Sequence, residues 1–184
     1  MKILAFGASN SKTSINKALA QLTATLVPNA DVEVLDLNDY ALPIYSEDLE
    51  KEIRLPEAAR KFFEKIGSAD GVIVSFAEHN GTYSAAYKNL FDWASRIDQK
   101  VFQDKPTIYL STSPGPGGAG SVLASAKGSA EFFGVDLRAA VSVRNFYDVF
   151  DTSSGRITDP GVLSELTAAA QSLALNEAAE RLAS

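Results

Sequence analysis

Short runs of apolar residues, each about the length of a β-strand, recur along the chain and alternate with segments of a different periodicity. Most are rich in aliphatic residues, as strands buried on both faces of a parallel sheet are. The runs lie at Lys2–Phe6, Val32–Leu37, Val72–Phe76, Thr107–Leu110 and Leu137–Val143. They predict five strands.

The segments between these runs place their apolar residues on one face of a helix. The clearest stripe has the spacing i, i+4, i+7 and i+11 and consists of Ile15, Leu19, Leu22 and Leu26. Similar patterns, weakest in the first, predict helices over Pro56–Ile66, Ala86–Ile97, Val122–Phe133 and Val162–Leu182. The chain therefore alternates strand and helix from end to end.

This alternation predicts an α/β fold with helices on both faces of a parallel sheet, because crossover helices must pack back onto the sheet. Five strands in 184 residues favour a flavodoxin-like, doubly wound strand order over the six-stranded dinucleotide-binding fold. We expect residues 1–184 to form a single domain. In such a fold, ligands bind beyond the carboxyl ends of the strands. We therefore expect the binding site at three loops that follow strands, Gly7–Ser14, Ala77–Tyr83 and Ser111–Gly120.

The first of these loops is crowded with hydroxyl groups at the start of a predicted helix. Its side chains include Ser9, Ser11, Thr13 and Ser14, with the amides of Asn10 and Asn16 beside them. A helix N-terminus offers unpaired N–H groups and a positive dipole end, so this loop can hold a phosphate. Helix capping would explain one hydroxyl but not four. The glycines of a Walker A loop or a dinucleotide fingerprint are missing, which favours a monophosphate.

The second loop combines a turn signal with polar and aromatic side chains. Asn80-Gly81 predicts a tight bend, and Glu78, His79 and Tyr83 lie around it. These groups could border a planar ligand, or they could form a plain exposed turn. In the helix that follows, Phe91 and Trp93 suit the core or a subunit interface.

The third loop is rich in glycine and proline. Four glycines (Gly115, Gly117, Gly118 and Gly120) follow a central strand directly and would let the backbone approach a ligand closely. A simple linker would explain the glycines, but not their position.

Composition narrows the chemistry available to the protein. The chain has 17 Lys and Arg against 23 Asp and Glu, no Cys and one His. The sequence has no cluster of positive charge of the kind that binds nucleic acid. Without cysteine, thiol catalysis and Cys-ligated metal centres are excluded. No apolar run approaches a membrane span and the N-terminal run is too short for a signal peptide. We therefore expect a cytoplasmic protein with no metal site.

Together the three loops resemble those of the NADPH-dependent FMN reductase family, and the resemblance covers nearly the whole chain. The pattern Ser-x-Ser-x-x-Ser-x-Asn starts at Ser9, and Glu78–Gly81 is followed by Lys88–Trp93. Lys12 stands where many members have Arg, and His79 where many have Tyr.

The resemblance implies FMN as cofactor and NADPH or NADH as hydride donor. It implies that the phosphate is held by Ser9, Ser11, Thr13, Ser14, Ile15 and Asn16. The flavin ring would be bordered by Glu78, His79, Asn80, Gly81, Thr82, Thr112, Ser113, Gly115 and Gly117. An aromatic wall could come from Tyr45, Tyr83, Phe91, Trp93 or Phe146. Family members are commonly homodimers or homotetramers, and the helix around Trp93 is the expected interface.

We therefore expect two-electron transfer from NAD(P)H through FMN to a small-molecule acceptor such as free flavin, a quinone, an azo compound or a metal oxyanion. No side chain is assigned a catalytic role, because the flavin supplies the hydride chemistry. A flavodoxin-type electron carrier and a non-catalytic flavin or phosphate binder are alternatives. A serine hydrolase is a further alternative, and it would need His79 as its base, because the chain has no other histidine.

Overall fold

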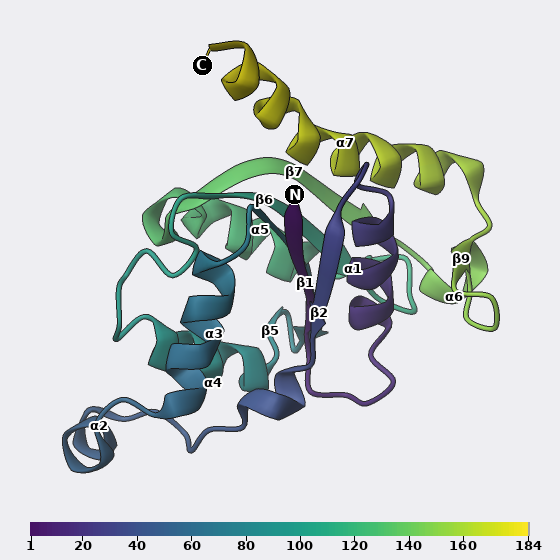
Figure 1. The fold of residues 1–184 in the computed structure, drawn as a ribbon. Coiled ribbons are helices and arrows are strands. Elements are labelled where there is room, and N and C mark those ends of the chain that lie inside the picture. Colours follow the sequence, from purple (N-terminus) through teal and green to yellow (C-terminus); the bar gives the residue numbers. More distant parts are fainter. Residues whose placement is uncertain (184) are drawn as a thin grey trace.

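A five-stranded parallel sheet forms the centre of the molecule (Figure 1). The computed structural model describes the backbone of residues 1–183 and the side chains of residues 1–174. In spatial order the sheet is β2-β1-β3-β6-β7, and every neighbouring pair is parallel. The strands are β1 (Lys2–Ala8), β2 (Asp31–Leu35), β3 (Gly71–Phe76), β6 (Lys105–Thr112) and β7 (Val135–Val143). All five predicted strands and the predicted fold class are confirmed.

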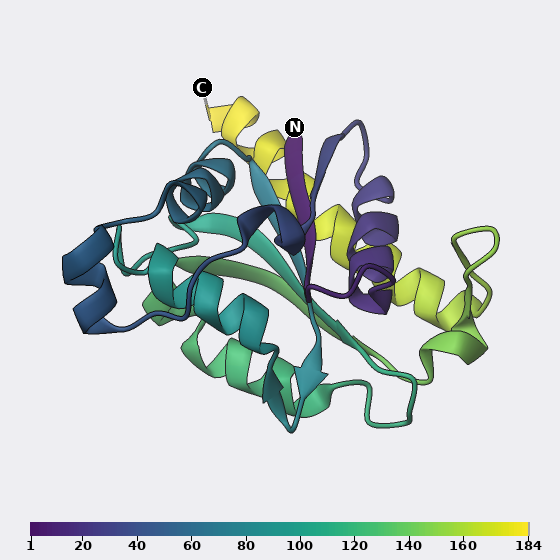
Figure 2. The ribbon, with the colours of Figure 1, turned by 90° about the horizontal axis from the view of Figure 1, so that it is seen from below.

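Helices cover both faces of this sheet (Figures 1 and 2). One face carries α1 (Ile15–Thr25) and α7 (Pro160–Ala183), and the other carries α3 (Glu57–Gly67), α4 (Ala85–Ala94) and α5 (Gly120–Ser129). The five predicted helices are confirmed, and α1, α4 and α5 end earlier than predicted. The predicted helix over Val122–Phe133 is wrong at its end, where a separate 3-10 helix, η2 (Glu131–Phe133), precedes Gly134. Gly134 has a φ of 67° and turns the chain into β7.

Two hydrophobic cores lie on opposite faces of the sheet because successive side chains of a strand alternate. In β1, Leu4 and Phe6 pack into the core under α3, α4 and α5, whereas Ile3 and Ala5 pack under α1 and α7. All four are completely buried. The sheet is therefore a rigid platform whose carboxyl edge can hold a site.

Several short elements were not predicted from the sequence. They are η1 (Leu37–Tyr40), α2 (Glu47–Ile53), β4 (Glu78–His79), β5 (Thr82–Tyr83), α6 (Phe146–Val149), β8 (Phe150–Asp151) and β9 (Arg156–Ile157). Helix α2 buries none of its side chains, so it has no apolar stripe to detect. The predicted strand over Val32–Leu37 is also too long, because Asp36 caps η1 by accepting a hydrogen bond from the Asn38 N–H.

Within the described part of the chain, no helix is both long and apolar enough to cross a bilayer.

Candidate functional site

Three loops meet at the carboxyl edge of the sheet, because β1, β3 and β6 are neighbours there. They enclose an open cavity of about 310 Å³. It is lined by Ser9, Ser11, Thr13, Ser14, Ile15, Asn16, Ala77, Glu78, His79, Thr112, Ser113, Pro114 and Tyr147. Ten of the residues predicted for the site are among them. The three loops that the sequence singled out thus form one cavity.

The first loop reaches the cavity because α1 packs directly against β1. A Cβ on Gly7 would lie 2.4 Å from the Lys17 backbone nitrogen and 2.7 Å from the Lys17 Cα. Only glycine allows this close approach without moving the helix. The N-terminus of α1 is therefore held at the end of β1, where the hydroxyl-rich loop turns.

Two hydroxyls of this loop accept hydrogen bonds from the backbone, and each still has a proton to donate. Ser14 caps α1, its Oγ accepting a hydrogen bond of 3.1 Å from the Lys17 N–H. The Ser9 Oγ accepts one of 3.1 Å from the Ser11 N–H. The N–H groups of Ile15 and Asn16 belong to the first helical turn, where no intrahelical acceptor exists. Hydroxyl and amide donors therefore converge where an anion would be stabilised by the helix dipole.

The Asn16 side chain is used inside the protein rather than offered to a ligand. Its Oδ1 accepts hydrogen bonds from the Ser75 hydroxyl (2.7 Å) and the Thr112 N–H (3.2 Å). Its Nδ2 donates to the Thr112 carbonyl at 3.2 Å. Asn16 thus joins α1 to β3 and β6, and its backbone N–H is the more available donor. Asn16 lines the cavity, and the predicted contact with the phosphate is assigned to its backbone N–H.

The second loop is a two-residue hairpin, β4–β5, attached to a helix. Asn80 and Gly81 have φ of 52° and 79°, the positive pair that a type I′ turn requires. The Glu78 Oε2 accepts a 2.9 Å hydrogen bond from the Val122 N–H in the first turn of α5. His79 is exposed at the cavity. The tip, Asn80–Thr82, lies outside the lining of the cavity.

The third loop folds largely on itself. The Gly115 carbonyl accepts hydrogen bonds from the Ser113 hydroxyl (3.2 Å) and the Asn145 N–H (3.0 Å). Thr112 donates its hydroxyl proton to the Val143 carbonyl at 2.7 Å. Thr112, Ser113 and Pro114 line the cavity, but Gly115 and Gly117 do not. The glycines shape the loop rather than line the cavity.

The aromatic group at the cavity is Tyr147, which the sequence did not single out. It lies in α6 and is 61% exposed. The five suspected aromatics, Tyr45, Tyr83, Phe91, Trp93 and Phe146, do not line this cavity. Trp93 is fully buried and donates its Nε1–H to the Pro43 carbonyl at 2.8 Å, so its side chain is in the core and not at an interface surface. Tyr147 directly follows Phe146, one of the five suspected aromatics.

Positive charge at the cavity comes mainly from the backbone. Among the described residues that line it, none is Lys or Arg. Lys12 lies beside it, on an adjoining hollow that shares Thr13, Ser14, Ile15 and Tyr147. Lys17 is paired with Asp36 at 2.6 Å, and this hydrogen bond lowers the pKa of Asp36 to about 2. Hydroxyls, free N–H groups and a helix dipole fit the phosphate of a mononucleotide such as FMN.

Comparison with known proteins agrees with this fit. Residues 1–148 match the model of the NADPH-dependent FMN reductase family. An NADPH:quinone oxidoreductase of Arabidopsis thaliana is 35% identical over 125 residues, which is 66% of this chain and 62% of that protein. The match thus spans less than two thirds of the plant protein's length. A 2-hydroxy-1,4-benzoquinone reductase of a Burkholderia species is 32% identical over 74% of each chain.

A solved structure shares the fold over almost its whole length. The flavoenzyme NAD(P)H:(acceptor) oxidoreductase FerB of Paracoccus denitrificans superposes with a TM-score of 0.77, covering 94% of both chains at 24% identity.

Proposed function

The chain belongs to the NADPH-dependent FMN reductase family, and from this premise we propose that it is an FMN-dependent NAD(P)H oxidoreductase that reduces a small-molecule acceptor. The observation that carries the proposal is the set of hydroxyl and N–H donors at the start of α1, in one cavity with the ends of β3 and β6. When bound, FMN supplies hydride chemistry that side chains cannot. This protein's residues bind and orient it.

Two kinds of donor would hold the phosphate. The hydroxyls of Ser9, Ser11, Thr13 and Ser14 give directional hydrogen bonds, and the N–H groups of Ile15 and Asn16 add the positive end of the helix dipole. Because these donors are fixed by Gly7 packing and by helix capping, little ordering is needed when the phosphate binds.

The rest of the cavity would hold the flavin ring. We assign its borders to Glu78 and His79 on one side and to Thr112 and Ser113 on the other, all of which line the cavity. Asn80, Gly81, Thr82, Gly115 and Gly117 lie outside the cavity lining and remain predicted contacts at the edge of the ring. Tyr147 supplies an aromatic surface beside the ring.

The names of the relatives support a proposal for the acceptor class. The Arabidopsis and Burkholderia proteins are, by name, quinone reductases. A further relative, from Pseudomonas aeruginosa, is named an NAD(P)H-dependent FMN reductase and is 29% identical over 86% of this chain. We therefore propose a quinone or free flavin as acceptor and NADPH or NADH as donor. The proposal includes a single domain, a homodimer or homotetramer, and a cytoplasmic location.

The test is an anaerobic spectroscopic titration of the purified protein. Added FMN should bind, and its visible absorption should then bleach on addition of stoichiometric NADPH. A quinone should restore the absorption. Free FMN with NADPH and no protein is the control, because slow bleaching there sets the background. FMN that binds but stays oxidised under NADPH would contradict the proposal and favour an electron carrier.

The oligomeric state needs its own measurement. The chain has a mass of 19.6 kDa, so a dimer or tetramer should elute from a calibrated gel-filtration column at two or four times that mass. A fully active species at the monomer mass would refute this part of the proposal.

A further inference from the structure

A second cavity, of about 200 Å³, lies between α4, α5 and the sheet, and it shares no lining residue with the proposed flavin cavity. Aromatic rings form its floor and walls. Six of these rings belong to Phe76, Tyr87, Phe91, Phe102, Tyr109 and Phe133. Protein interiors are normally packed without such spaces. The cavity therefore needs an explanation of its own.

Two largely buried tyrosines that line this cavity have hydroxyls without a protein partner among the described residues. Tyr87 and Tyr109 are each 3% exposed, and within the described part of the chain neither hydroxyl makes a hydrogen bond. Burial raises the pKa of both phenols, so each keeps its proton and can donate it. Neither oxygen is among the fully buried unpaired atoms of the described residues, so both can be reached from the cavity and are available to donate a hydrogen bond to a guest.

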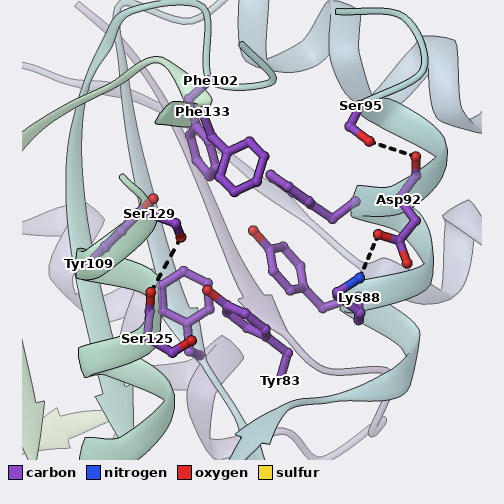
Figure 3. Close-up of a pocket in the computed structure, with 12 residues that line it drawn as sticks. Tyr83, Lys88, Asp92, Ser95, Phe102, Tyr109, Ser125, Ser129 and Phe133 are labelled. Atoms are coloured by element: carbon purple, nitrogen blue, oxygen red, sulfur yellow. Dashed lines mark hydrogen bonds and ion pairs between the residues drawn. The ribbon is translucent and has the colours of Figure 1, made fainter. Parts of the chain in front are cut away.

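The rim of the cavity is polar. Figure 3 shows Lys88, Asp92 and Ser95 on one side and Tyr83, Ser125 and Ser129 on the other. Lys88 and Asp92 form an ion pair of 2.6 Å along α4. An aromatic interior with a few polar groups at its edge is the usual character of a small-molecule site.

We propose that this cavity binds a single aromatic or quinonoid ring that carries an oxygen substituent, with the oxygen accepting hydrogen bonds from Tyr87 and Tyr109. Its size suits one ring, since an engineered cavity of roughly 150 Å³ already admits benzene. The surrounding rings offer the edge-to-face packing that aromatic groups prefer, as Phe76 and Tyr109 already show at 5.0 Å between ring centroids.

The site is separate from the flavin cavity but adjoins it through one hairpin. Tyr83 lies on the rim, and its cross-strand partner is Glu78, which lines the flavin cavity. Phe76 ends β3 one residue before Ala77 of the flavin cavity. The inference is therefore a second binding site beyond the proposed redox function.

The test uses 4-fluorophenol, which is not reduced by NAD(P)H, observed by fluorine NMR with the full-length, FMN-saturated protein and no NAD(P)H. Binding should be saturable. Tyr87→Phe and Tyr109→Phe keep the rings and should each weaken binding about 5- to 10-fold, the value of one hydrogen bond. Ser129→Phe should fill the cavity and abolish binding.

Tyr40→Phe is the matched control, because Tyr40 packs against Phe62 on another part of the molecule, and it should bind like the wild type. Absence of saturable binding to the wild type would mean that the cavity holds only water and would overturn the proposal. Unchanged affinity in both tyrosine variants would overturn it as well, even if Ser129→Phe failed to fold. Since no NAD(P)H is present, the result is independent of the redox assay.

Discussion

Single hydroxyl groups of the first loop differ in how much of the fold they support. Ser14 caps α1 and Ser9 fixes the turn, whereas Ser11 is exposed and its hydroxyl makes no hydrogen bond within the described residues. All three line the proposed phosphate site. Binding and stability can therefore be separated by choosing which one to remove.

Ser11→Ala should weaken FMN binding about 10-fold and leave the free energy of unfolding unchanged, because a hydrogen bond to a charged phosphate is lost but no cap is. Ser14→Ala should weaken binding similarly and also lower the free energy of unfolding by about 1 kcal/mol. Titration by FMN fluorescence and urea denaturation of the apoprotein measure the two effects. Thr25→Ala, at the far end of α1, is the control and should leave FMN affinity unchanged.

Asn16 should matter for stability more than any hydroxyl of the loop. Its side chain makes three buried hydrogen bonds, so Asn16→Ala leaves the Ser75 hydroxyl and the Thr112 backbone without these partners. We expect the free energy of unfolding to fall by about 2–4 kcal/mol, measured by urea denaturation of the apoprotein. Asn10→Ala, at an exposed position of the same loop, should change it by less than about 0.5 kcal/mol. Equal effects would contradict the linking role.

At the scale of elements, the site depends on how closely α1 approaches β1. The contact is made by backbone atoms, since a Cβ on Gly7 would fall 2.4 Å from the Lys17 nitrogen. Backbone cannot move aside as a flexible side chain can. The position of the helix N-terminus, and with it the phosphate site, is therefore set by one residue that has no side chain.

Gly7→Ala should lower the free energy of unfolding by about 3 kcal/mol and abolish tight FMN binding, because α1 must move away from β1. Gly128→Ala is the control, and it should change the free energy of unfolding in the opposite direction. Gly128 lies in α5, and a Cβ there would meet no atom within 4 Å, so alanine should stabilise the protein by about 0.5–1 kcal/mol. Thermal unfolding of both variants measures the change in stability, and FMN titration measures the change in affinity. A Gly7→Ala protein that binds FMN normally would refute the argument.

At the scale of the whole molecule, ion pairs fasten the edge strand β2 and its following turn to the rest of the fold. Glu33 pairs with Lys65 of α3 and with Lys2 of β1, and Asp36 pairs with Lys17 of α1. The hydrogen bond from Lys17 lowers the pKa of Asp36 from 3.8 to about 2, and that from Lys65 lowers the pKa of Glu33. A carboxyl whose folded pKa is lowered stabilises the fold above its unfolded pKa, and this stabilisation is lost as the pH falls through the folded value.

The stability of the wild type should therefore decrease between about pH 4 and pH 2. Asp36→Asn keeps an acceptor for the Asn38 N–H but loses the charge opposite Lys17. It should be less stable than the wild type at neutral pH, by a margin that vanishes towards about pH 2. Urea midpoints across this range measure the margin. Asp48→Asn, at a fully exposed position, should give no such pH-dependent difference.

The sequence alone determined the fold class, five strands, five helices and the three loops of the site. These follow from local causes, namely side-chain periodicity, turn residues and the common edge at which parallel strands end. The short elements could not be predicted from the sequence, because they bury too little apolar surface to produce a periodic pattern. Helix α2, with no buried side chain, is the clearest case.

Only the tertiary structure decided which members of those loops line the cavity. Asn16 turned inward to Ser75 and Thr112, residues far away in sequence, and Tyr147 took the place expected for other aromatics. The aromatic cavity between α4 and α5 likewise combines residues from Phe76 to Phe133. Such arrangements depend on packing between distant segments, and the periodicity of a single segment does not encode which side chain of a loop finds a partner across the sheet.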